Sequence, residues 1–247
     1  MLRHLDRLEG ISVSRKDRHD FVSEVDRMAE QAIIQTLRKA YPEHAILAEE
    51  SGAQPGDDYQ WIIDPLDGTT NFLHGFPQFA VAIALRHRGQ LQQAVIYDPL
   101  RNELFTASRG AGAQLNEHRI RVSKVRQLDD ALLETGFPFR RQQWLDDYLV
   151  MFKTLFAQTP GIRRAGSAAL DLAYVAAGRL DGFWEIGLSP WDIAAGALLI
   201  QEAGGLVSDF SGGADYLATG NVIAGNSAIA PAIQRAIAPL LPEGLRR

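Results

Sequence analysis

The stretch from Trp61 to Phe72, WIIDPLDGTTNF, constrains the fold more than any other part of this chain. A short apolar run ends in Asp64, and Pro65 follows at once. Because the residue before a proline is held away from helical dihedrals, this order predicts a strand that opens into a tight, bent loop. Asp64 and Asp67 then lie at the carboxyl end of the strand, with free backbone amides just beyond them.

This loop offers two kinds of ligand group. The carboxylates of Asp64 and Asp67 can converge, and the carbonyl of Leu66 between them provides a third oxygen. Carboxylates bind hard cations, and backbone amides at a helix start bind anions. The stretch therefore predicts a site where a divalent metal and a phosphate meet. The alternative is an Asx turn in which both aspartates only accept local amides, while Thr69 only caps a helix.

Two glutamates follow the strand-like run AILA and form a second acidic position. Adjacent side chains on extended backbone point to opposite sides, so either Glu49 or Glu50 can face the loop at Asp64. The alternative is a solvated turn with no ligand. The Glu49–Glu50 pair indicates a ligand site only in combination with the other acidic positions.

A third acidic position lies far along the chain. Asp192 is in the first turn of a helix opened by Pro190, and Glu185 ends the strand before it. The small residues of AAGALLIQEAGG permit close packing, which would hold Asp192 rigidly against a partner layer. The alternative for Asp192 is stabilisation by the helix dipole, worth about 0.3–1 kcal/mol, and for Glu185 a solvated loop.

Composition excludes several classes of function. The chain of 247 residues has no cysteine, which excludes disulfides, zinc–thiolate sites and thiol nucleophiles. Its net charge is −5 with acids and bases interleaved, so direct binding of duplex nucleic acid is not expected. We see no secretory signal and no run of about 18 apolar residues that would span a membrane. The sequence therefore predicts a soluble cytoplasmic protein.

The predicted elements divide the chain into two halves. Residues 1–130 are predicted to be α+β, because a helix is followed by neighbouring strands; residues 131–247 alternate strands and helices, which favours an α/β layer with a mixed sheet. With no linker between them, the halves are expected to pack as one unit. In the first half we predict a helix over 26–40 and strands over 45–48, 79–85, 93–97 and 103–107. In the second half we predict strands over 132–135, 182–186, 206–210 and 221–224, and helices over 143–156, 167–177, 190–203 and from 227.

Smaller features have plain structural interpretations. Ser167 is predicted to cap its helix, and His74, His87 and His118 lie in polar, loop-like surroundings without the spacing of metal ligands. Leucines at positions 2, 5 and 8 suggest the end of an amphipathic helix.

Three separated signatures, AEESG, WIIDPLDGTTNF and PWDIAAGALLIQEAGG, occur in this order. With them the chain resembles the inositol monophosphatase family, and most of all its bacterial inositol-1-phosphatase branch. The segments VSRKDRHDFVSEVD, TGFPF and RRAGSAALDLAYVAAGRLDGFWE also look like that branch, so the resemblance runs from about Ile11 to the carboxyl terminus. It implies a layered α/β/α/β/α sandwich shared with fructose 1,6-bisphosphatases, an active site between the two halves, and a homodimer.

The resemblance also implies a metal-binding role for each matching residue. Glu49, Asp64 and the carbonyl of Leu66 would hold one Mg²⁺. Asp64, Asp67 and Asp192 would hold a second, with Asp64 bridging the two. Some family members use a third, weakly held Mg²⁺, and many are inhibited by Li⁺.

Catalytic and substrate-binding roles follow in the same way. Thr69 with Glu49 would orient the attacking water beside the metal ligand Asp67, and the amides of Gly68 and Thr69 would contact the phosphate. The residues expected on the substrate side are Gly166, Ser167, Ala168, Glu185 and Asp192, and those expected to support the site are Asp26 and Lys16.

The implied activity is hydrolysis of a small polyol phosphate, with myo-inositol 1-phosphate as the leading substrate. Fructose 1,6-bisphosphate, histidinol phosphate, a nucleotide 3′-phosphate and NADP remain alternatives within the class. A regulatory role is the alternative of another class, because some bacterial relatives associate with the transcription machinery. Family members usually carry a longer amino-terminal helix, so either the start is truncated or the protein manages without it.

Overall fold

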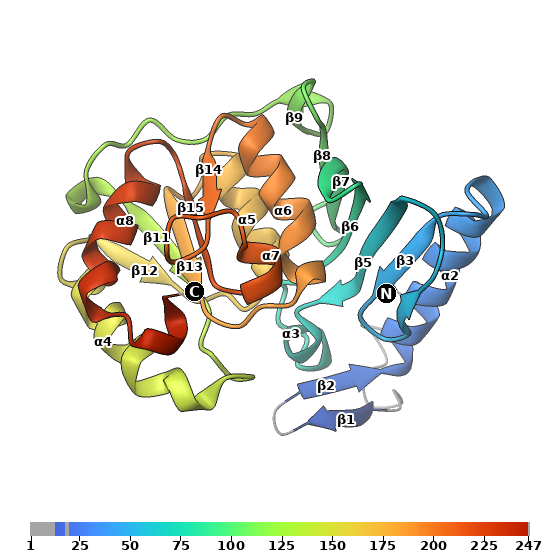
Figure 1. The fold of residues 1–247 in the computed structure, drawn as a ribbon, viewed down its shortest axis with the longest axis horizontal. Helices are drawn as coiled ribbons and strands as arrows, with labels where there is room; N and C mark the ends of the chain where they lie inside the picture. The colour runs from blue at the N-terminus through green and yellow to red at the C-terminus, as the bar shows by residue number, and fades with distance from the viewer. Residues whose placement is uncertain (1–12, 18–19, 247) are drawn as a thin grey trace.

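The computed structural model describes residues 13–17 and 20–246, with side chains from Ser23 onward. Within these residues the strands form a hairpin, an eight-stranded sheet and a five-stranded sheet (Figure 1). The hairpin pairs β1 (Val13–Asp17) with β2 (Asp20–Ser23). The strands of the large sheet are β3 (Ala45–Ala48), β4 (Gly52–Gln54), β5 (Tyr59–Asp67), β6 (Ala80–His87), β7 (Gln90–Asp98), β8 (Glu103–Ser108), β9 (Gly112–Leu115) and β10 (His118–Arg119). Those of the smaller sheet are β11 (Leu132–Thr135), β12 (Gly161–Arg163), β13 (Gly182–Glu185), β14 (Leu206–Ser208) and β15 (Val222–Gly225).

Helices separate and cover the two sheets. The α-helices are α2 (Glu24–Ala40), α3 (Thr69–Leu73), α4 (Leu145–Phe156), α5 (Ala168–Ala176), α6 (Pro190–Glu202), α7 (Tyr216–Thr219) and α8 (Ile229–Ile237). Short 3₁₀ turns span Leu128–Asp130, Gln142–Trp144, Ala238–Leu240 and Glu243–Leu245.

Strand order places the ends of distant strands together. The large sheet runs β10-β9-β8-β7-β6-β5-β3-β4 and is antiparallel except where β3 pairs with β5. The smaller sheet runs β12-β11-β13-β15-β14, with β11 parallel to both neighbours. Because β3 and β5 are parallel, their carboxyl ends meet at one edge, which brings the Glu49 turn beside Asp64.

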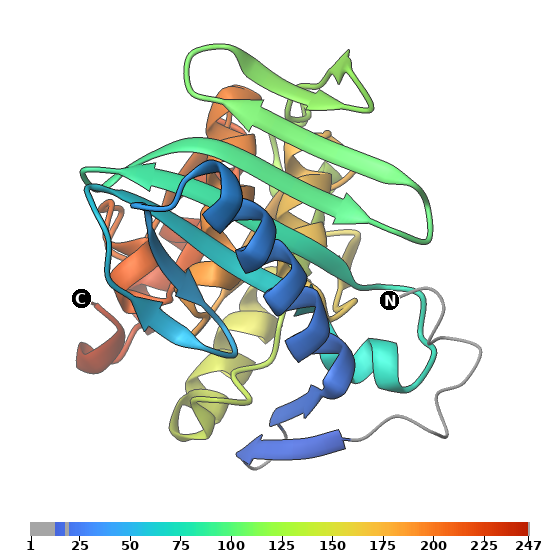
Figure 2. The same cartoon turned by 90° about the vertical axis from the view of Figure 1, so that its right-hand side faces the viewer.

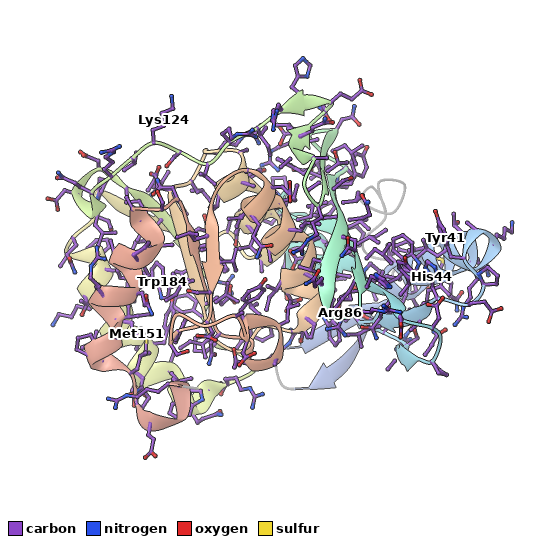
Figure 3. All side chains as sticks on the ribbon, turned by 45° about the horizontal axis from the view of Figure 1, so that its top comes forward. Tyr41, His44, Arg86, Lys124, Met151 and Trp184 are labelled. Atoms are coloured by element: carbon purple, nitrogen blue, oxygen red, sulfur yellow. The ribbon has the colours of Figure 1, made fainter. Side chains whose placement is uncertain are left out.

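The layers are α/β/α/β/α, as the family resemblance implied. Helix α2 crosses the outer face of the large sheet (Figure 2), while α5 and α6 lie between the two sheets and contact strands of both. Helices α4 and α8 pack together, and α8 covers the far face of the smaller sheet. In this outer core Trp184 and Met151 are fully buried and belong to one apolar cluster (Figure 3).

The central helices approach closely because their residues are small. Gly196 of α6 faces Leu172 of α5, and a Cβ on Gly196 would lie 2.4 Å from the Leu172 Cβ. Nine residues of α6 are buried, so this helix is apolar all round, which is typical of a helix enclosed between layers.

Most predicted elements are confirmed within a few residues, and the strands 45–48 and 132–135 match at both ends. Several boundaries were wrong by two or three residues. The helix predicted over 26–40 begins at Glu24, the strand predicted over 79–85 ends at His87, and the strand predicted over 93–97 begins at Gln90. The helix predicted from 143 begins at Leu145 after a 3₁₀ turn, the last helix begins at Ile229 rather than 227, and the strand predicted over 206–210 ends at Ser208. The strands β4, β9, β10 and β12 were not predicted, because each is four residues or fewer and lacks a periodic pattern.

The predicted amino-terminal helix end lies outside the described residues. Over the described part of the chain, every helix is too short or too polar to cross a bilayer.

Candidate active site

A cavity of about 310 Å³ opens between the carboxyl end of β5 and the amino-terminal ends of α5 and α6. It gathers residues from both halves of the chain. Its lining includes Glu49, Asp64, Leu66, Asp67, Gly68, Thr69, Asn71, Gly136, Arg140, Gly166, Ser167, Ala168, Asp171, Glu185 and Asp192.

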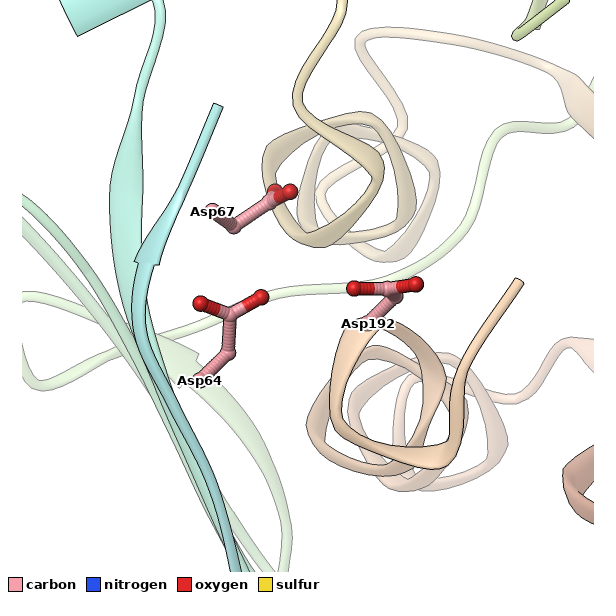
Figure 4. A group of neighbouring side chains, drawn as sticks. All are labelled: Asp64, Asp67 and Asp192. Carbon is pink, nitrogen blue, oxygen red and sulfur yellow. The ribbon is translucent and has the colours of Figure 1, made fainter. Parts of the chain in front are cut away.

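Three aspartates converge in this cavity. Asp64, Asp67 and Asp192 each offer a carboxylate oxygen, and these oxygens all lie within 4.8 Å of one another (Figure 4). Asp64 and Asp67 belong to the end of β5, whereas Asp192 comes from the first turn of α6. The sequence interpretation required residues more than a hundred positions apart to meet, and the structure brings them together.

A β-bulge lets the first two aspartates share a side. Side chains three positions apart on a regular strand point to opposite faces. In β5, however, Asp64 is paired with Ala82 and Asp67 with Ala80, so one extra residue is inserted between them. The bulge turns both carboxylates toward the cavity. The Asx turn considered as an alternative is present as well, because the Leu66 amide donates to Asp64 Oδ1 at 3.0 Å.

Asp67 is held by the second half of the chain. Its Oδ2 accepts a hydrogen bond of 2.6 Å from Ser167 Oγ and one of 2.8 Å from the Ala169 amide, at the start of α5. Ser167 is the N-cap residue of α5, as predicted, but its side chain makes no capping bond. Asp67 instead accepts the Ala169 amide, which a capping hydroxyl could have accepted, because a carboxylate is a stronger acceptor than a hydroxyl oxygen.

Asp192 does both things that its sequence position suggested. It forms a capping box with Ser189, whose amide donates to Asp192 Oδ2 at 2.7 Å. Asp192 still contributes to the carboxylate group in the cavity. The capping box fixes its position at the rim of α6.

Burial and mutual repulsion raise the pKa values of these acids. Desolvation is the largest cause of the raised pKa of Asp64, followed by the charges of Glu49, Asp67 and Asp192. Desolvation and the Asp192 charge raise the pKa of Asp67 to about 7. Desolvation also raises the pKa of Asp192 and, well above its usual range, that of Glu185. Adjacent buried carboxylates cannot all ionise cheaply, so the site favours a cation.

Glu49 lies beside this group. Its side chain is 8% exposed, and its Oε1 is 3.6 Å from Arg140 Nη2. It interacts with Asp64 by charge and a side-chain hydrogen bond. Glu50 follows it in the turn, and its backbone amide donates to Glu30 Oε2 on α2.

Thr69 points toward a buried acid. Its Oγ1 lies 2.9 Å from Asp26 Oδ1 and 3.0 Å from the Leu66 carbonyl oxygen. Capping of α3 by Thr69 was the alternative, and it is wrong: the N-cap is Gly68 and no side chain caps this helix. Asp26 also accepts the Ser23 amide at 3.0 Å, so this acid links α2 to the loop. Lys16 lies in β1, and its side chain is outside the described residues.

The turn after Asp67 needs glycine. Gly68 has φ +88°, and a Cβ there would lie 2.8 Å from the Gln78 carbonyl oxygen. Asn71 then ties the turn to the opposite wall, because its Nδ2 donates to the carbonyls of Gln78, Ala165 and Gly166. Gly166, Ser167 and Ala168 therefore face Gly68 and Thr69 across the cavity.

Glu185 ends β13 and is 6% exposed. It lies directly against Gly136, since a Cβ on Gly136 would be 2.1 Å from Glu185 Oε1. The solvated loop considered for Glu185 is thereby ruled out. Its neighbour Asp181 is structural and accepts the Leu132 amide at 2.7 Å.

Three acids and one arginine of this region were missed from the sequence. Asp171 on α5 is 1% exposed, and its Oδ1 has no hydrogen-bond partner among the described residues. Desolvation and Glu134 raise the pKa of Asp171 well above its usual range, and desolvation raises that of Glu134 to about 7. The sequence did contain a signal for Asp171, because an aspartate inside an apolar helix such as AALDLAYVA is unfavourable unless it has a specific role. Arg140 carried no such signal.

The fourth missed residue, Glu30, fixes the Glu49 turn. Glu30 is 3% exposed on α2. Its Oε2 accepts the Glu50 amide at 2.8 Å and its Oε1 the Ser51 amide at 2.9 Å. On the other side, the Glu49 amide donates to the Ile63 carbonyl at 3.1 Å. The backbone around Glu49 is thus clamped between α2 and β5.

Replacing Glu30 by glutamine is expected to loosen this clamp. The new NH₂ group is itself a donor, so it cannot accept the hydrogen bond of the backbone amide that it faces. Residues that orient metal ligands typically cost about 10–100-fold in metal affinity or activity when changed. With Glu49 as the Mg²⁺ ligand that the family resemblance implies, we expect a loss of Mg²⁺ affinity in this range, measured by calorimetry. The exposed neighbour Gln31→Ala is the control. Unchanged affinity in a folded Glu30→Gln protein would show that the clamp does not position Glu49.

The donor set fits a hard divalent cation. The converging atoms are carboxylate oxygens, with the Leu66 carbonyl beside them. Mg²⁺ and Ca²⁺ prefer such oxygen ligands. Buried carboxylates without a compensating charge are costly, which is a second reason to expect a cation here.

Comparisons with known proteins agree with this geometry. The family model described as "Inositol monophosphatase family" matches residues 3–244. The chain is 59% identical to the Nus factor SuhB of Pseudomonas aeruginosa, over 100% of this chain and 93% of that protein. It superposes on the extragenic suppressor protein suhB of Bartonella henselae with a TM-score of 0.93 at 49% identity, covering 96% of this chain and 92% of the other. An inositol monophosphatase from Anabaena gives a TM-score of 0.84 at 44% identity, covering 88% and 87%. The chain belongs to the inositol monophosphatase family.

Proposed function

We propose that this protein is a Mg²⁺-dependent phosphomonoesterase that hydrolyses a small polyol phosphate, with myo-inositol 1-phosphate as the leading substrate. The observation that carries the proposal is the convergence of Asp64, Asp67 and Asp192 beside a glycine-led turn that begins a helix. Membership of the family supports phosphatase activity. The two halves, 1–130 and 131–247, would then form one catalytic unit, because each supplies part of the carboxylate group.

Phosphate monoesters resist hydrolysis because their anionic oxygens repel a nucleophile and the leaving alkoxide is poor. When bound, Mg²⁺ would supply positive charge to neutralise the phosphoryl oxygens, acidify a water and stabilise the leaving oxygen. Glu49, Asp64 and the Leu66 carbonyl would hold one ion, and Asp64, Asp67 and Asp192 the other.

The protein groups around the metals would position the reactants. Thr69 and Glu49 would orient the attacking water; the contact of Thr69 Oγ1 with Asp26 supports this role, since it fixes the hydroxyl. The amides of Gly68 and Thr69 would bind the phosphate, as amides at a helix start do. Glu185 would accept hydrogen bonds from substrate hydroxyls, a role supported by its burial at the cavity wall.

A substrate panel tests the proposal. Phosphate release would be measured with Mg²⁺ for myo-inositol 1-phosphate, fructose 1,6-bisphosphate, histidinol phosphate, a nucleotide 3′-phosphate and NADP. We expect the highest kcat/KM for the inositol ester and loss of turnover with EDTA. A higher kcat/KM for a bisphosphate or nucleotide would overturn the assignment of myo-inositol 1-phosphate as the substrate. Turnover that persists in EDTA would overturn the metal mechanism.

A second role is favoured by the names of the relatives. The protein that matches this chain over its whole length at 59% identity is called a Nus factor, a name that points to transcription. We propose that this chain also associates with the transcription machinery through its surface, with no direct binding of duplex nucleic acid. The test is co-purification with RNA polymerase in wild-type and Asp67→Asn proteins; equal recovery would separate association from catalysis.

The oligomeric state, lithium response and location are proposed from the family resemblance. We expect a cytoplasmic homodimer that Li⁺ inhibits. Light scattering coupled to size exclusion measures the first property, and phosphate release against LiCl concentration measures the second.

A further inference from the structure

Arg140 connects the carboxylates of the two halves. It lies after β11, in the loop that leads to the 3₁₀ turn Gln142–Trp144. Its Nη1 is 3.2 Å from Asp192 Oδ2 and 3.3 Å from Ser189 Oγ, and its Nη2 is 3.6 Å from Glu49 Oε1. One guanidinium therefore spans Glu49, from the first half, and Asp192, from the second.

The arginine is the accessible member of this arrangement. Its side chain is 26% exposed, whereas those of Glu49 and Asp192 are 8% and 7% exposed. A guanidinium that reaches buried carboxylates from an open loop can leave them at small cost to the core. Its charge also acts on the wider group, since Arg140 lowers the pKa values of Asp67, Asp192 and Glu185 against the larger effect of burial.

Glu49 and the three aspartates are held differently. Asp64, Asp67 and Asp192 already present oxygens to one point, but Glu49 is not part of that converging group. Asp192 uses Oδ2 for Arg140 and for the Ser189 amide. Arg140 thus contacts both the glutamate that would complete the metal site and the aspartate that belongs to it.

We propose that Arg140 is the resident cation of the metal-free site: it neutralises Glu49 and Asp192 and competes with the divalent cations for them. The proposal rests on the metal-dependent function proposed above. Two positive charges repel when both approach the same carboxylates, so metal binding must weaken the contacts of Arg140 and Arg140 must weaken metal binding. By linkage the two effects are equal in free energy.

Arg140→Gln tests this competition without measuring activity. Mg²⁺ would be titrated into the metal-stripped full chain and followed by calorimetry. Removing one nearby charge from a partly exposed site is expected to tighten Mg²⁺ binding by roughly three- to tenfold. In the absence of metal, the same variant is expected to unfold at a lower temperature than wild type. On addition of Mg²⁺ its unfolding temperature is expected to rise by more than that of wild type.

Two further variants make the result specific. Arg141→Gln removes the same charge one residue away, from a side chain that lies against Gly187, and is expected to change the dissociation constant by less than about twofold. Arg140→Lys keeps the charge but lacks the planar fork, so its affinity should fall between those of wild type and Arg140→Gln. If Arg140→Gln does not fold without metal, the lysine variant carries the test.

The outcomes separate this inference from the function on which it rests. Unchanged or weaker Mg²⁺ binding in Arg140→Gln overturns the competition, because Arg140 would then be neutral or would order Glu49 for the metal. An equal effect in Arg141→Gln overturns its specificity. If wild type itself binds no Mg²⁺ by calorimetry, the metal-dependent function fails first, and the resident-cation role fails with it.

Discussion

Asp67→Asn is expected to lower kcat/KM for phosphate release by about a thousandfold, the scale on which a lost charge-stabilising group acts in a preorganised site. Asp67 is one of three carboxylates within 4.8 Å of one another. Asparagine keeps the size of the side chain and its acceptor oxygen for Ser167 and Ala169, but it removes the negative charge. The loss should therefore come from metal binding and chemistry rather than from a disturbed fold.

The control for this variant is Asp130→Asn, which makes the same chemical change at an exposed position. We expect it to retain wild-type kcat/KM in the same assay. Turnover of Asp67→Asn within tenfold of wild type at saturating Mg²⁺ would contradict the assignment of Asp67 as a metal ligand.

The sequence was most informative where one short stretch determines its own geometry. The strand and the glycine turn at Gly68 are local consequences of WIIDPLDGTTNF, and the structure has both. The loop predicted to open at Pro65 was wrong, because β5 continues through Pro65 to Asp67 by pairing with β6. The bulge between Asp64 and Asp67 was not foreseen. It depends on pairing with β6, and pairing between strands does not follow from the residues of one strand.

Contacts between distant elements were the part that the sequence could not supply. Ser167 looked like a helix cap, because local rules do not include an aspartate a hundred positions away that accepts its hydroxyl. Glu30 occupies an ordinary polar position of an amphipathic helix in the sequence. In the structure its carboxylate accepts the amides of Glu50 and Ser51, just after the end of β3. Arg140 lies in a loop without periodicity, so nothing along the chain marks it as a partner of Glu49.

The metal-stripped protein is expected to lose stability as pH rises from about 4 to about 7. The carboxyls of Asp64, Asp67 and Asp192 have pKa values raised above the usual 3.8, that of Asp67 to about 7. A carboxyl with a raised pKa in the folded state favours folding while it is protonated. This contribution is complete below the unfolded pKa and is lost as pH passes through the folded pKa.

The size of the effect follows from the same shift. For Asp67 alone it is on the order of 4 kcal/mol, since the pKa rises by about three units, from 3.8 to about 7, and each unit corresponds to about 1.4 kcal/mol. Coupling among the acids spreads this contribution over the group. Mg²⁺ competes with these protons, so the stabilisation by a fixed Mg²⁺ concentration should grow over the same interval. Thermal unfolding between pH 5 and 7.5, with EDTA and with Mg²⁺, measures both trends.

Asp67→Asn connects the two largest predictions, because it should move activity and metal-free stability in opposite directions. Without the charge, the variant should unfold at a higher temperature than wild type at pH 7.5 in EDTA. Its unfolding temperature should depend less on pH and should rise less on addition of Mg²⁺. Like charges that are buried together repel one another unless a cation compensates them, so removing one charge relieves the repulsion and also removes one proposed metal ligand. If metal-free Asp67→Asn is less stable than wild type at pH 7.5, the hydrogen bonds of Asp67 with Ser167 and Ala169 stabilise the fold by more than the repulsion of its charge destabilises it.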